Sequence, residues 1–113
     1  MLTLPIKKKW FDMILSGEKK EEYRATTRYY TKRFQSVGLL DENGNPTGHK
    51  AFICFRNGYR KDSPEFVLMV TLKIGTGYPA WGAEEGEWYY VLEILELYVQ
   101  ISMDCNQIAT NCN

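Results

Sequence analysis

The sequence predicts an α+β fold, a small β-barrel of about five to six mostly antiparallel strands with two short helices near the N-terminus. Three observations predict it. Apolar residues recur at helical spacing only within the first 37 residues, and strand-like apolar runs follow at 51–55, 65–74 and 87–97. The connections between these runs are short. At 113 residues the chain can bury one sizeable core and needs no second domain.

The N-terminal elements are a strand and a helix. Residues 2–6 form a short apolar run that charge ends, which is typical of a strand. In residues 7–16, Trp10 and Ile14 lie one helical turn apart, so we expect an amphipathic helix. Gly17 is well placed to end that helix in the left-handed conformation.

A charged segment and a second helix come next. Residues 19–25 have no apolar face of helical period, which favours a strand. Thr27 can cap the helix that follows. The stripe predicted to be buried on that helix is Tyr30, Phe34 and Val37.

The second half reads as strands joined by turns. Residues 40–50 form a loop by composition. In the run 87–97, alternation places Trp88, Tyr90, Leu92 and Ile94 on one face and Leu95 on the other, with core packing expected for Tyr90. We assign residues 1–98 to the domain and 99–113 to a polar C-terminal tail.

Charge is balanced overall but unevenly distributed. The formal net charge is zero, which argues against a bulk electrostatic binder of nucleic acid. Residues 1–33 nevertheless carry nine Lys or Arg and four Asp or Glu, a net charge of +5, whereas residues 65–113 carry one and seven, a net charge of −6. This asymmetry indicates a basic patch that could meet phosphates, or two ends that neutralise each other.

Several classes of protein are not expected. No apolar run approaches the ~20 residues that span a bilayer, and the N-terminus lacks the charge order of a secretory signal. We therefore expect a cytoplasmic protein with no membrane partner, monomeric by default. The thiols Cys54, Cys105 and Cys112 lack metal-ligand spacing, and unpaired, reduced thiols are favoured over a Cys105–Cys112 bridge. We expect neither a metal nor a cofactor.

The charged stretch at 18–24 contains the main candidate site. Glu22 and Arg24 are two residues apart on a strand and therefore point to one face, and a turn can bring Lys19 to the same face. If that face is exposed, the pair is an ordinary surface ion pair. If it lines a cleft, Arg24 and Lys19 can bind phosphate, and Glu22 can orient them or accept hydrogen bonds from a base.

Other candidate ligand-binding residues flank the strands. Arg28 lies on the second helix. Arg56, Asn57 and Tyr59 follow an apolar strand, where Arg56 could bind a second phosphate and Tyr59 could stack on a base. Asn57 with the following glycine is also a common hairpin turn without any ligand. Trp81, in the glycine-rich loop, is a candidate for stacking or for a lid.

The segment from Gly17 to Arg24, GEKKEEYR, resembles the G-x-K-x-x-E-x-R signature of the ASCH domain family. Gly17, Lys19, Glu22 and Arg24 match its four positions. FRNGY and WGAEEGEWYYVLEI are also similar to segments of small bacterial and phage ASCH proteins. The likeness covers the chain to about Leu97.

The resemblance implies a PUA-like barrel whose cleft binds RNA or a nucleotide, with these motif residues lining it. A bacterial branch of the family hydrolyses the acetyl amide of N4-acetylcytidine with a Lys, a Thr and a Glu. Its lysine would match Lys19, but Glu22 stands where that branch has its threonine. The alternative is therefore a small hydrolase acting on a modified nucleoside or on RNA, with Glu22 as general base and Lys19 or Arg24 stabilising the anionic transition state.

Overall fold

The computed structural model describes residues 1–100, and these residues form a small α+β fold. In chain order the elements are β1 (Leu2–Pro5), α1 (Lys8–Leu15), β2 (Glu21–Ala25), α2 (Arg28–Ser36), β3 (Ala51–Arg56), β4 (Glu65–Gly75), the short 3₁₀ helix η1 (Pro79–Trp81) and β5 (Tyr89–Gln100).

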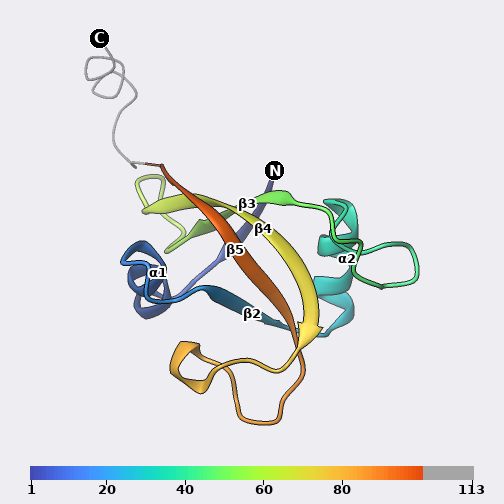
Figure 1. The fold of residues 1–113 in the computed structure, drawn as a ribbon. Helices are drawn as coiled ribbons and strands as arrows, with labels where there is room; N and C mark the ends of the chain where they lie inside the picture. Colours follow the sequence, from blue (N-terminus) through green and yellow to red (C-terminus); the bar gives the residue numbers. More distant parts are fainter. Residues whose placement is uncertain (101–113) are drawn as a thin grey trace.

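The five strands form one curled sheet with the spatial order β1-β3-β4-β5-β2. β1 pairs with β3 in parallel, and the other three neighbouring pairs are antiparallel. The sheet bends into half a barrel, with α1 and α2 near opposite ends of it (Figure 1). The predicted class, a small and mostly antiparallel barrel-like sheet with two helices, is confirmed.

Local signals in the sequence set both helix boundaries. Gly17 has a φ of +82°, so it adopts the left-handed conformation that ends α1. The Thr27 hydroxyl accepts a hydrogen bond of 3.3 Å from the backbone N–H of Tyr30 at the start of α2. Both predictions from the sequence are confirmed.

The core lies between the helices and the curled sheet. From α1, the ring of Phe11 stacks on Phe66 of β4 at 4.5 Å between centroids. From α2, the ring of Phe34 is nearly perpendicular to that of Tyr90 on β5, with 5.6 Å between the ring centroids. Tyr90 is buried, which confirms its expected core position. Both helices thus contribute aromatic side chains to the core that the curled sheet encloses.

An irregularity in β5 breaks the alternation that the sequence predicts. Met69 is paired with Glu96 and Val70 with Ile94, which leaves Leu95 as an extra residue between them. Leu95 is exposed, whereas Leu97 packs against the core. A β-bulge of this kind bends the strand and increases its twist. The predicted facing therefore holds only as far as Ile94.

The ends of β5 also differ from the expected run at 87–97. The strand begins at Tyr89, so Trp88 precedes it and is exposed. It continues to Gln100, two residues past the boundary set at residue 98. Cys105, Cys112 and the rest of the predicted tail lie outside the described residues. Among residues 1–100, no helix is both long and apolar enough to cross a membrane.

Candidate functional site

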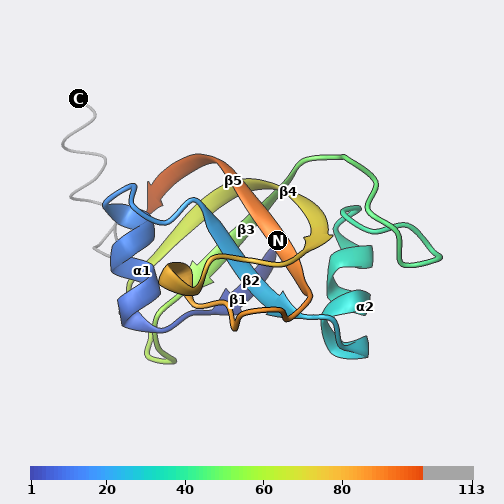
Figure 2. The same cartoon turned by 60° about the horizontal axis from the view of Figure 1, so that its bottom comes forward.

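The two edge strands β1 and β2 approach each other at the open side of the half-barrel (Figure 2). A pocket lies here, lined in part by residues of both strands. The guanidinium of Arg24 on β2 spans this opening and donates a hydrogen bond of 2.7 Å to the carbonyl of Pro5 on β1. The pocket has a volume of about 560 Å³. Its lining comes from residues 5–7, Trp10, residues 22–24 and residues 57–59.

Three charged side chains form a buried cluster beside this pocket. Glu22 is central: one carboxylate oxygen lies 3.2 Å from the ammonium of Lys19. The other oxygen accepts hydrogen bonds of 2.7 and 3.1 Å from the guanidinium of Arg24. Only 2%, 5% and 9% of Lys19, Glu22 and Arg24 are exposed. The surface ion pair considered from the sequence is therefore not what these residues form.

The side chain of Lys19 is enclosed by protein groups and has no exposed surface. Its ammonium donates to the carbonyl of Trp81 and lies 5.1 Å and 4.8 Å from the ring centroids of Trp10 and Tyr23. Burial is the largest influence on its pKa and lowers it, although the Glu22 carboxylate opposes this. Lys19 is not among the residues that line the pocket.

Glu22 and Arg24 line the pocket but are largely occupied by their partners. Four of the five guanidinium N–H groups of Arg24 are used by Glu22, Pro5 and the hydroxyl of Tyr30. Glu22 accepts three contacts, and a carboxylate has about four acceptor positions. Within residues 1–100, this leaves one donor on Arg24 and one acceptor position on Glu22.

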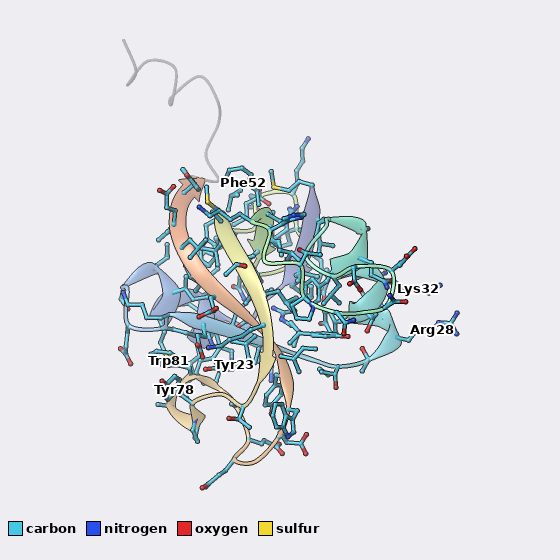
Figure 3. The ribbon with its side chains drawn as sticks, turned by 45° about the vertical axis from the view of Figure 1, so that its right-hand side comes forward. Tyr23, Arg28, Lys32, Phe52, Tyr78 and Trp81 are labelled. Carbon is cyan, nitrogen blue, oxygen red and sulfur yellow. The ribbon has the colours of Figure 1, made fainter. Side chains whose placement is uncertain are left out.

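The glycine-rich connection between β4 and β5 covers Lys19. A Cβ atom at Gly77 would lie 2.4 Å from the ring of Tyr23, and one at Gly82 would lie 2.9 Å from the ring of Trp10. Only glycine permits this close approach. Tyr23, Trp81 and the neighbouring Tyr78 group together here (Figure 3). The connection thereby delivers the Trp81 carbonyl to the lysine.

The segment after β3 contributes to the pocket. The side-chain amide of Asn57 donates a hydrogen bond of 2.8 Å to the carbonyl of Ile6, which ties this segment to the start of α1. Tyr59 also lines the pocket, and 93% of it is exposed. Asn57 and Gly58 do stand in the connection between antiparallel strands β3 and β4, so turn and pocket lining coincide.

The remaining candidates stand away from the pocket lining. Trp81 contributes its carbonyl to Lys19. The guanidinium of Arg56 contacts the carbonyl of Arg60 and lies 3.9 Å from Glu65. Arg28 is exposed on α2 and projects away from the glycine-rich connection (Figure 3).

Six of the lining residues were not among the candidates from the sequence, and two of them, Trp10 and Lys7, bring an aromatic ring and a charge to the pocket. Trp10 was assigned to the buried side of a helix, and the pattern gives no sign that it also borders a pocket. Lys7 belongs to a run of three lysines at the start of α1, where the helix dipole disfavours positive charge. That local conflict is the signal for it in the sequence, since it is compatible with lysines kept for an external partner as well as with a solvated first turn.

Comparison with known proteins found no match. No protein-family model, no curated protein and no solved structure matches the chain. Within residues 1–100, no group of three or more His, Cys, Asp or Glu side chains could hold a metal ion.

Proposed function

We propose that this protein is a nucleic-acid-binding module of the ASCH type, which takes a nucleobase into the pocket between β1 and β2. The observation that carries the proposal is the pairing of Glu22 and Arg24 at the pocket wall. Each keeps one hydrogen-bonding position for a ligand, one an acceptor and the other a donor. The remaining donor is on Nη1 of Arg24 and the remaining acceptor position is on Oε1 of Glu22. A base edge carries both donors and acceptors that such groups can pair with.

The size and charge of the pocket support this assignment. A volume of about 560 Å³ lies within the range of pockets that bind small organic ligands. Lys7 and Arg24 against Glu22 give the pocket lining a net charge of +1, which favours an anionic ligand. Trp10 lines the pocket and brings an aromatic side chain beside the ligand, with the ammonium groups of Lys9 and Lys19 lying 4.7 and 5.1 Å from its ring centroid.

The geometry favours base recognition over phosphate capture in the pocket. Lys19 is enclosed, and Arg24 has one N–H to offer, so neither can grip a phosphate through two hydrogen bonds without losing its present partners. Lys7 is exposed at the pocket and remains for that role.

The same enclosure gives no support to the hydrolase alternative. A catalytic lysine must touch its substrate, whereas the side chain of Lys19 has no exposed surface. We expect no release of acetate from N4-acetylcytidine, and release of acetate by the intact chain would reverse this choice.

Binding of a fluorescein-labelled random RNA decamer, measured by anisotropy over a salt series, tests the proposal. We expect log affinity to fall linearly with log salt, and Lys7→Ala to reduce the slope by about 0.7, the loss of one phosphate contact on a single strand. Lys7 makes no side-chain capping bond to α1, so this change spares the fold.

Lys32→Ala is the matched control, because Lys32 is exposed on α2 and does not line the pocket. It should leave the slope unchanged. Absence of binding at low salt would refute the proposed function, and an equal effect of both variants would refute the assigned site.

A further inference from the structure

We infer that the ligand of this pocket is a single-stranded oligonucleotide rather than a free nucleotide, with Tyr59 stacking on the base next to the one in the pocket. This inference rests on the proposed function and specifies its substrate class. The pocket has few free cations to bind the phosphate of a mononucleotide. Its rim, in contrast, carries exposed cations and Tyr59, which can contact neighbouring nucleotides of a strand.

The pocket interior has little to hold the phosphate of a mononucleotide. Its buried cations are committed to protein partners: Lys19 to Glu22 and the Trp81 carbonyl, and Arg24 to Glu22, Pro5 and Tyr30. A free nucleotide would therefore gain one exposed cation, Lys7, and that contact is weakened by solvent.

The rim extends the positive charge in two directions. Lys7 is followed by Lys8 and Lys9 in the first turn of α1, and Tyr59 is followed by Arg60 and Lys61 in the β3–β4 connection. All five cations are exposed. Figure 2 shows this connection at the end of the molecule where α1 begins.

Two of these charges are partly offset. Lys8 lies 2.6 Å from Asp12 and Arg60 lies 3.7 Å from Asp62, both pairs being largely exposed. Exposed pairs of this kind are weak and exchange readily for other partners. Successive phosphates of a strand can therefore run between the two basic segments.

Tyr59 supplies a second aromatic surface at the rim. It lines the pocket, and with 93% of its surface exposed it is the most exposed of the large apolar residues described. In the free protein this ring leaves its apolar surface in contact with water, so it gains none of the free energy that burial would supply. Stacking of a neighbouring base would cover it, and such stacking needs an unpaired strand.

The test compares ligand lengths. The affinities of the four nucleoside 5′-monophosphates and of the four homotrinucleotides are measured by calorimetry against the intact chain. We expect the best trinucleotide to bind roughly 5- to 150-fold more tightly than its mononucleotide, the gain that stacking of one base supplies. Tyr59→Ala should reduce that ratio severalfold.

Tyr29→Ala is the matched control, because Tyr29 is an exposed tyrosine of α2 that does not line the pocket. It should leave the ratio unchanged. Equal affinities for mononucleotide and trinucleotide, or a ratio insensitive to Tyr59→Ala, would overturn this inference while leaving the proposed function standing. No binding at either length would overturn this inference, and it would overturn the proposed function as well if the RNA decamer also fails to bind.

Discussion

Two ion clusters of basic and carboxylate side chains meet at β2, one through Glu22 and the other through Glu21, and they differ in their access to water. The inner cluster joins Glu22 to Lys19 and Arg24 at 3.2 and 2.7 Å, with side chains at most 9% exposed. The outer cluster joins Lys73 to Glu21 and Glu93, each at 3.4 Å, and the Lys73 side chain is 49% exposed.

The difference teaches why similar geometry has unequal consequences. Charges in water lose little when a partner is removed, because solvent replaces the partner. Charges in a buried cluster have no such replacement, so loss of one leaves the others uncompensated. The inner cluster thus holds β2 against β1 and shapes the pocket. The outer cluster contributes less, because Lys73 and Glu93 are in contact with water.

Removal of the central inner carboxylate should have the largest effect. Glu22→Gln leaves Lys19 and Arg24 buried without their counter-charge, and we expect the free energy of unfolding to fall by about 3–5 kcal/mol. Urea titration followed by circular dichroism measures it. The matched change in the outer cluster, Glu93→Gln, should cost less than about 1 kcal/mol, because the Glu93 side chain is 41% exposed. Similar losses from both variants would remove the distinction between the clusters.

The two lysines should respond to pH with opposite signs. Burial lowers the pKa of Lys19 below 10.5, so between that lowered pKa and 10.5 the unfolded chain binds more protons. This group therefore makes stability rise with pH in that window. Unfolding of the protein and of Lys19→Met, compared from pH 7 to 10.5, should show the rise in the former alone.

Lys73 provides the contrast. Burial is the largest single influence on its pKa and lowers it, but the carboxylates of Glu21 and Glu93 together outweigh this and raise the pKa above 10.5. Its contribution to stability is present below 10.5 and is lost as pH rises through the raised value. Lys73→Met should thus remove a fall in stability at alkaline pH, and a difference of the same sign for both lysines would contradict the assignment.

The smallest effect is expected from the outer cluster at neutral pH. Lys73→Ala should lower the free energy of unfolding by about 0.5 kcal/mol at low ionic strength. In about 1 M salt the screening length falls to ~3 Å, and the difference between variant and parent should vanish. A loss that persists in high salt would mean that the Lys73 stem stabilises by packing instead.

The sequence by itself determined the elements and the facing of the motif. Alternation on a strand put Glu22 and Arg24 on one face, Gly17 ended α1, and Thr27 capped α2, because each depends on residues within one or two turns of the chain. The same local rules do not say whether that face is exposed to solvent or lines a cleft.

Only the tertiary structure decided between them. The carbonyl that encloses Lys19 comes from Trp81, the bridge across the open side joins Arg24 to Pro5, and the bulge at Leu95 bends β5. These contacts join residues far apart in sequence or depend on how two strands pair, and no local pattern encodes them. Such contacts bury Lys19, Glu22 and Arg24, and buried charges must pair with one another. The charged segment therefore forms a paired cluster beside the pocket instead of a solvated surface.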